Sequence, residues 1–94
     1  MEVAAFRATL AGAAPPVGLS LAAQALWWDA RGDWTKAHEC AQAQDDATGA
    51  LVHAYLHRVE GDLVNAGYWY RRAGRPARTD ALAAEWDALV AELA

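Results

Sequence analysis

Apolar and polar positions along this chain follow a helical period, and short polar breaks divide the pattern into six segments. Strict apolar–polar alternation is absent and β-branched residues are scarce, so the pattern favours helices over strands. The breaks are rich in glycine, proline and aspartate, which end one helix or cap the next. The pattern predicts helices over about residues 2–11, 19–30, 34–44, 47–60, 63–73 and 80–92.

The residues in the breaks predict how each helix begins and ends. Gly12 is expected just beyond the first helix, and Pro15 and Pro16 prevent its continuation. Four polar residues are expected as N-caps of the later helices: Asp33, Asp46, Asp62 and Thr79. Because the connections are short, consecutive helices should lie antiparallel to each other.

The segment 80–92 carries the clearest amphipathic pattern. One stripe of this helix contains Leu82, Trp86, Leu89 and Leu93, and three acidic residues are expected off it: Glu85, Asp87 and Glu92. The stripe is interpreted first as a surface that faces the protein's own core over the preceding hairpin. The other interpretation is a contact between two copies of the chain, which would make a homodimer through this C-terminal helix.

A weak internal repeat occurs at an offset of 29 residues, because residues 25–34 align with residues 54–63. Gly32 and Asp33 align with Gly61 and Asp62, which predicts two tight turns that each lead into a capped helix. Four alanines also align and are expected where paired helices touch: Ala25 with Ala54, and Ala37 with Ala66.

This pattern resembles the tetratricopeptide and Sel1-like helical repeats over roughly residues 21–76. Four residues of the second copy fit that resemblance, with Gly61 and Asp62 in the turn: Ala54, Ala66, Tyr70 and Ala73. The sequence also resembles a small bacterial protein family, which implies no activity.

The fold predicted from these observations is all-α, a compact bundle of about six helices that forms one domain over residues 1–94. Two antiparallel hairpins of tetratricopeptide type occupy about residues 19–74. The N-terminal helix, about 2–11, and the C-terminal amphipathic helix, about 80–92, are expected to close the core.

Two histidines four residues apart are the main candidate for a functional site. His53, His57 and Glu60 fall on one face of the segment 47–60, away from its apolar face. In the repeat alignment Gln24 and Trp28 occupy the matching face of the earlier helix. The resemblance to helical repeats implies that such first helices line a concave binding surface, which would then contain all five residues.

Three chemistries remain open for this surface. A His–x₃–His pair on a helix can chelate a divalent metal with Glu60 as a further ligand, although Ala54 stands where zinc proteases carry glutamate. The histidines could instead form a buried hydrogen-bond network with Tyr55, Tyr68 or Asp29 as partners. The third alternative is a groove that binds a peptide or a small ligand.

A second candidate surface follows the run Tyr68–Trp69–Tyr70, which is expected to be buried on more than one side. Four arginines come next: Arg71, Arg72, Arg75 and Arg78. They suit a helix C-terminus electrostatically and are expected to pair with Glu60 or Asp62. Arg71, Arg72 and Arg75 are also interpreted as a patch for an acidic partner.

Composition narrows the function. A formal net charge of −4 argues against binding nucleic acid or an acidic membrane. The single cysteine, Cys40, excludes a disulfide framework and favours the cytoplasm, and neither a signal peptide nor a membrane span is apparent. No phosphate loop, dinucleotide fingerprint or nucleophile elbow is present, so an enzyme is not favoured.

The leading prediction is therefore a small cytoplasmic protein–protein interaction or scaffold module that works without a cofactor. Its expected partner is a protein or a peptide. The alternative is a protein that binds a metal or a small ligand through His53 and His57, a class that includes enzymes.

Overall fold

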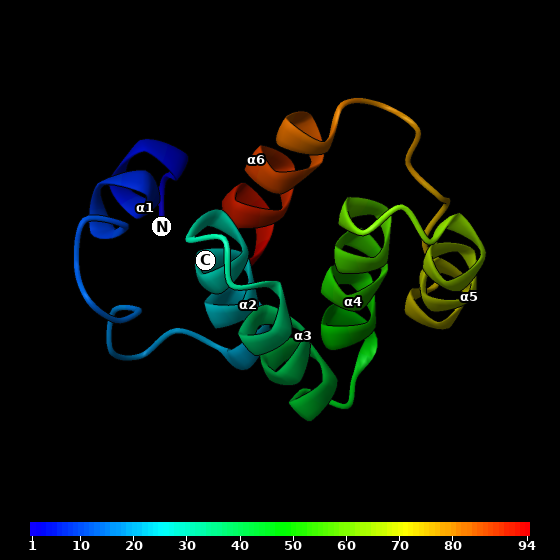
Figure 1. Cartoon of the computed structure of the whole chain (residues 1–94), viewed down its shortest axis with the longest axis horizontal. Helices are drawn as coiled ribbons and strands as arrows, with labels where there is room; N and C mark the ends of the chain where they lie inside the picture. Colours follow the sequence, from blue (N-terminus) through cyan, green and yellow to red (C-terminus); the bar gives the residue numbers. More distant parts are fainter.

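The computed structural model describes residues 1–94 and consists of six α-helices without strands (Figure 1). The prediction of an all-α bundle is therefore confirmed. The helices are α1 (Val3–Thr9), α2 (Leu21–Ala30), α3 (Trp34–Ala43), α4 (Ala47–Val59), α5 (Leu63–Ala73) and α6 (Leu82–Leu93).

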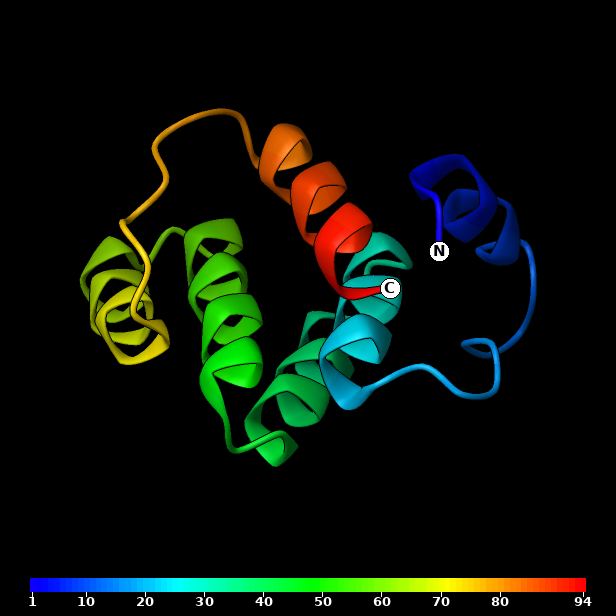
Figure 2. The ribbon, with the colours of Figure 1, turned by 180° about the vertical axis from the view of Figure 1, so that it is seen from behind.

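Helix α4 lies at the centre of the molecule, where α2, α3, α5 and α6 all pack against it. Helices α2 and α3 form one hairpin and α4 and α5 form the next, while α3 also packs against α4. Seen from either side, α5 and α1 lie at opposite edges of the molecule (Figures 1 and 2). The two termini meet, because the ammonium of Met1 donates to the carbonyl oxygen of Ala94.

The turns that begin α3 and α5 have the same geometry, so the 29-residue repeat of the sequence corresponds to a repeated turn. Gly32 and Gly61 have φ of 80° and 83°, a region that residues with a side chain rarely adopt. Asp33 and Asp62 follow them and cap α3 and α5 by accepting from a backbone N–H three residues on. Asp46 caps α4 in the same way, as predicted.

Three helix ends differ from the prediction by two residues, and the first is the start of α2, which begins at Leu21 with Ser20 as its N-cap. Thr79 does not cap α6, which begins two residues later than expected, at Leu82, with Ala81 at the N-cap position. Asp80 is held instead in the preceding extended segment, because its carboxylate pairs with Arg78 and its carbonyl accepts from Arg58. Helix α1 ends at Thr9, two residues earlier than predicted.

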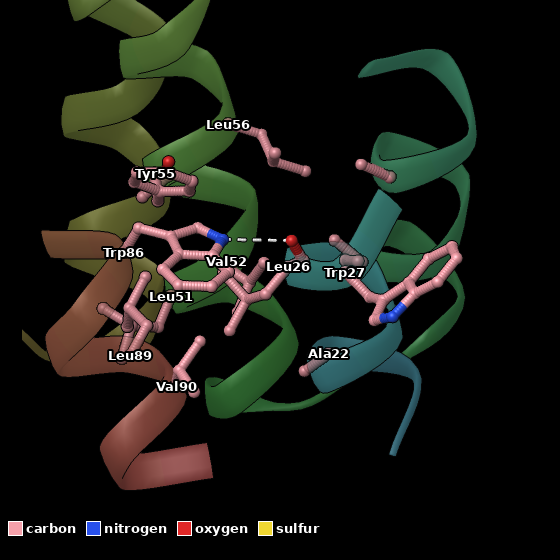
Figure 3. Packing of buried hydrophobic residues seen from close by; sticks show 14 of the residues in the cluster. Ala22, Leu26, Trp27, Leu51, Val52, Tyr55, Leu56, Trp86, Leu89 and Val90 are labelled. Atoms are coloured by element: carbon pink, nitrogen blue, oxygen red, sulfur yellow. Dashed lines mark hydrogen bonds between the residues drawn. The ribbon is translucent and has the colours of Figure 1, made fainter. Parts of the chain in front are cut away.

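The core is built where α2, α4 and α6 meet (Figure 3). The indole N–H of Trp86 donates to the carbonyl oxygen of Leu26 at 3.0 Å, which joins α6 to α2. Phe6 of α1 packs edge-on against the Trp86 ring at 5.7 Å. The largest fully buried apolar side chains are Trp27, Phe6, Leu26, Leu56, Val52 and Val90.

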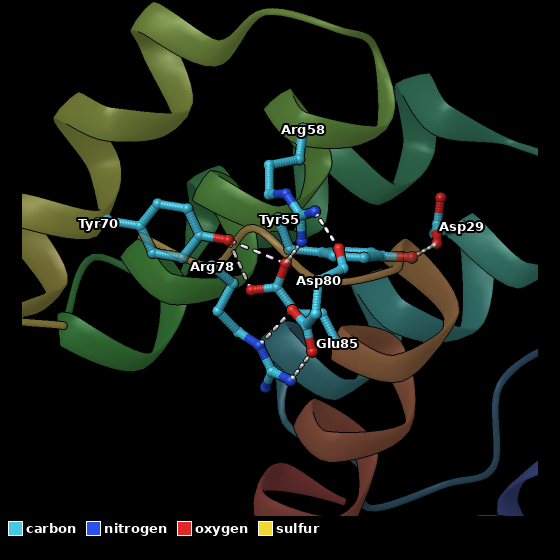
Figure 4. Close-up of polar contacts among 7 residues, drawn as sticks. All are labelled: Asp29, Tyr55, Arg58, Tyr70, Arg78, Asp80 and Glu85. Carbon is cyan, nitrogen blue, oxygen red and sulfur yellow. Dashed lines mark hydrogen bonds and ion pairs between the residues drawn. The ribbon is translucent and has the colours of Figure 1, made fainter. Parts of the chain in front are cut away.

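Glu85 is the charged residue that the core encloses, which corrects the prediction that it lies off the buried stripe of α6. Its carboxylate is fully buried and accepts from Arg58 Nη1 at 2.6 Å and from the Tyr70 hydroxyl at 2.6 and 2.9 Å (Figure 4). Helix α6 presents Glu85 and Val90 inward beside Trp86 and Leu89, whereas Leu82 is 37% exposed. The buried face of α6 therefore keeps Trp86 and Leu89 of the predicted stripe and widens on either side to Glu85 and Val90. The burial of Glu85 was not predicted because a buried ion pair has no apolar signature in the sequence.

Replacing Glu85 by alanine should lower the free energy of unfolding by about 3–5 kcal/mol, because the largely buried guanidinium of Arg58 would lose its partner. Glu92→Ala on the same helix is the matched control. The pair of Glu92 with Arg75 is exposed, so its loss should cost at most about 1 kcal/mol. Urea denaturation of both variants measures the difference, and equal losses would contradict the assignment.

Gly49 fixes how closely the end of α3 approaches α4. A Cβ at this position would lie 1.8 Å from the carbonyl oxygen of Gln44, a backbone atom. Gly67 in α5 has no such neighbour, since its nearest contact would be the side chain of Arg71 at 3.5 Å.

We therefore expect Gly49→Ala to destabilise the protein by about 1–3 kcal/mol through overpacking. Gly67→Ala should instead stabilise it by about 0.5–1 kcal/mol, since alanine is the better helix former. Thermal unfolding of the pair separates the two effects, and a stable Gly49→Ala protein would show that this approach is not tight.

Candidate functional site: the histidine centre

The antiparallel packing of α3 and α4 sets which side chains face each other. In such a hairpin, residues equally far from the turn lie at the same level, and residues 45 and 46 form the turn here. His38 and His53 are equally far from it, and their rings lie 4.5 Å apart, edge to face. Trp34 and His57 form the next such pair one turn away, with ring centroids 6.1 Å apart.

Three histidines meet at this level and form what we call the histidine centre: His38 of α3 with His53 and His57 of α4. His38 Nε2 lies 2.8 Å from His53 Nε2, and one ring nitrogen of each of the three residues lies within 4.8 Å of the others. His53 and His57 are only 3% and 7% exposed, while His38 is half-buried. All the histidines of the chain are therefore in one cluster.

Tryptophan rings cover the centre on two sides. Trp34 is stacked on His38 with centroids 4.9 Å apart, and Trp69 of α5 is stacked on His53 at 3.8 Å. The indole N–H of Trp34 donates to the carbonyl oxygen of Leu56 at 2.8 Å, which fixes that ring. The imidazoles of His38 and His53 are therefore oriented by packing before any ligand binds.

Glu60 orients the third imidazole. Its Oε1 lies 2.5 Å from His57 Nδ1, so Nδ1–H donates to the carboxylate and Nε2 is left free. A carboxylate in this position is the usual outer partner of a histidine that ligates a metal. Glu60 is thus a hydrogen-bond partner of His57 in the structure, whereas the sequence offered it as a further metal ligand.

The surroundings keep two of the imidazoles neutral. Burial, followed by the neighbouring His38 and His57 and by the Arg72 guanidinium, lowers the pKa of His53 to about 4. Burial and then His57 also lower the pKa of His38, against the opposing effect of Glu60 and Glu39. Neutral imidazole is the form that binds a metal ion.

The partners of the histidines differ from those predicted. Tyr55, Tyr68 and Asp29 were expected to bond to them, but the Tyr55 hydroxyl donates to Asp29 Oδ2 at 2.9 Å, away from the centre (Figure 4). The histidines bond to each other and to Glu60 instead.

Gln24 and Trp28 are not brought to the histidines. Gln24 Nε2 donates to the carbonyl oxygen of Leu19, and Trp28 packs against Trp27 and under the ammonium of Lys36. No hydrogen bond or ring contact joins either residue to His53 or His57. The physical reason is that α3 packs against both α2 and α4 and supplies His38 and Trp34 to this face of α4.

The arginines form separate contacts rather than one patch. Arg75 pairs with Glu92 and Arg78 pairs with Asp80. The predicted pairing of these arginines with Glu60 or Asp62 is therefore not formed. The Arg72 guanidinium lies 5.0 Å from the Trp69 ring, and its Nη1 donates to the Tyr68 hydroxyl at 3.3 Å. Arg71 is exposed and takes part in no ion pair.

His38 and the two stacking tryptophans were missed as site residues. The helical period relates residues of one segment only, and His38 lies on a different helix from His53 and His57. The available signal was the symmetry about residues 45 and 46, which pairs position 38 with 53 and position 34 with 57. A short antiparallel connection makes that symmetry a prediction of contact.

The chain matches no protein-family model, no curated protein and no solved structure. Its helices are also too short and too polar for any one of them to cross a lipid bilayer.

The depressed pKa of His53 predicts that the metal-free protein loses stability on mild acidification. Between pH 6.5 and 4 the unfolded chain binds a proton at this histidine and the folded chain does not, so stability falls as pH falls. The groups facing His53 are His38 from α3, His57 from its own helix and Arg72 from α5.

We expect the free energy of unfolding to fall by about 2 kcal/mol between pH 7 and pH 5 through this residue. Urea denaturation with a chelator present measures the change, and His53→Gln is the control because it cannot titrate. The same pH dependence in both proteins would contradict the assignment.

Proposed function

We propose that this protein binds a divalent transition-metal ion at the histidine centre, through ring nitrogens of His38, His53 and His57. The supporting observation is the convergence of three imidazoles from two helices. Two of them come from the i, i+4 pair that the sequence itself singled out. Three imidazoles are the protein ligand set of a known class of zinc centre.

The distances suit such an ion with little rearrangement. Ligand nitrogens about 2.0–2.1 Å from a tetrahedral ion lie about 3.3 Å from one another. His38 Nε2 and His53 Nε2, at 2.8 Å, would separate slightly, while the nitrogen of His57 would approach from within 4.8 Å. The ion would lie where the two Nε2 atoms now share a proton, and that ring would carry its proton on Nδ1 instead, so that both imidazoles ligate in the neutral form.

The ligand type narrows the choice of metal. Imidazole nitrogen suits zinc, copper and nickel, and oxygen-seeking ions such as magnesium and calcium are disfavoured. Three protein ligands leave one position of a tetrahedral ion for solvent or another small molecule. A pocket of about 230 Å³ lined in part by His53, Trp69 and Arg72 opens beside the centre and gives such a molecule access.

Metal binding should raise the melting temperature of the protein. An ion present at about 100 times its dissociation constant adds about 2.7 kcal/mol, which is about 10–20 °C for a domain of this size. Thermal unfolding with chelator, zinc, nickel or copper measures the shift. Absorption spectra with Co²⁺ report the ligand set, because the spectrum of an ion bound by three imidazoles differs from that of the hydrated ion.

Three variants locate the ion. His38→Asn changes the half-buried ligand and should abolish both the thermal shift and the Co²⁺ spectrum. Glu60→Gln should retain the site but weaken binding about 10–100-fold, because it only orients His57. Glu39→Gln, beside His38 but outside the centre, should bind as the parent does. A Co²⁺ spectrum identical to that of the hydrated ion in the parent protein would refute the proposal.

A further inference from the structure

Helix α5 leaves one of its faces without any partner in this chain. It packs against α4 alone and lies at the edge of the molecule (Figure 1). Leu63, Val64 and Tyr68 on this helix are 69%, 87% and 44% exposed. With Gly67 and Arg71 they fall within less than half a turn of the helix surface, and the buried Ala66 and Tyr70 lie outside that arc. We call these five residues the α5 outer face.

The charge at this face is positive and uncompensated. Arg71 lies at the middle of the face and makes no ion pair, and neither does Arg72 at its margin. The nearest acidic residues along the chain are already engaged: Asp62 accepts from Asn65 and Glu60 accepts from His57. An otherwise acidic chain therefore exposes apolar side chains next to two guanidinium groups that have no acidic partner.

The shape of the face suits a helix. Gly67 lies between Leu63 and Arg71 and presents no side chain, so the backbone there is open to close approach. A Cβ at Gly67 would contact only the movable end of Arg71, at 3.5 Å. Leu63, Val64 and Tyr68 would flank the approaching helix as apolar ridges.

We propose that the α5 outer face docks an acidic amphipathic helix of another protein. The apolar stripe of that helix would cover Leu63, Val64 and Tyr68, and its carboxylates would pair with Arg71 and Arg72. A second copy of this chain fits less well, because a symmetric contact would bring the arginines of both copies into one interface without free acidic partners. The surface is separate from the histidine centre, since α5 turns Trp69 toward His53 and its outer face away.

Two synthetic peptides of about 18 residues, five helical turns, test the chemistry of the partner. Both carry leucines at i, i+3, i+4 and i+7 spacing, and the polar positions are glutamate in one and lysine in the other. Amide chemical shifts of the labelled protein are followed during titration. We expect the glutamate peptide alone to shift the signals of residues 63–72, with an affinity that weakens as salt is added.

Variants assign the contributions of charge and apolar contact. Arg71→Glu and Val64→Glu should each weaken the glutamate peptide about tenfold or more, and the dispersed spectrum shows that each variant is folded. Val17→Glu is the matched control, since Val17 is fully exposed but lies outside α5.

Four outcomes would overturn the proposal. Equal binding of the lysine peptide would show that charge does not select the partner. Shifts confined to other helices, or none up to the solubility limit, would exclude docking here. A dimer in sedimentation equilibrium that Val64→Glu dissociates would assign the face to a second copy of the chain.

Discussion

The buried carboxylate of Glu85 is the contact on which the arrangement of the last three helices depends. Helices α5 and α6 do not pack against each other, and inside the core they are joined through Tyr70, Glu85 and Arg58. A carboxylate in this environment is tolerated because both of its oxygens accept hydrogen bonds, and one of the donors is the guanidinium of Arg58. Arg58, which makes this contact, directly follows His57 along α4. The same end of α4 therefore takes part in both the core and the histidine centre.

Helix α4 connects these features because none of its sides is free along most of its length. Residues 49–57 are all buried, in keeping with a helix that is apolar on most sides. Two of those residues are histidines, whose burial requires that their polar atoms find partners. His38 partners one ring nitrogen of His53 and Glu60 one of His57, while Trp34 and Trp69 stack on the rings of His38 and His53. The centre is therefore fixed in geometry by the packing of α3, α4 and α5.

The two proposals assign different faces of α5 to different tasks. Its inner side places Trp69 on His53 and Tyr70 on Glu85, so the position of α5 affects both the centre and the core. Its outer side has no neighbour and carries the free arginine. Helix α5 packs on α4 and is held further by the contacts of Trp69 and Tyr70. Its outer face can therefore bind a partner while the helix itself stays in place.

The sequence by itself determined the six helices, the aspartate caps at residues 33, 46 and 62 and the two matched turns, because these depend on local period and on side chains that bond to nearby backbone. It also singled out His53, His57 and Glu60, which lie on one face of a single helix. Only the tertiary structure decided what meets that face. Helix α3 lies between that face and α2, so Gln24 and Trp28 do not reach the histidines. His38 on α3 does contact His53, because an antiparallel turn pairs residues of the two helices that it joins. The burial of Glu85 was also decided there, since a charge enters a core only where partners from other helices compensate it.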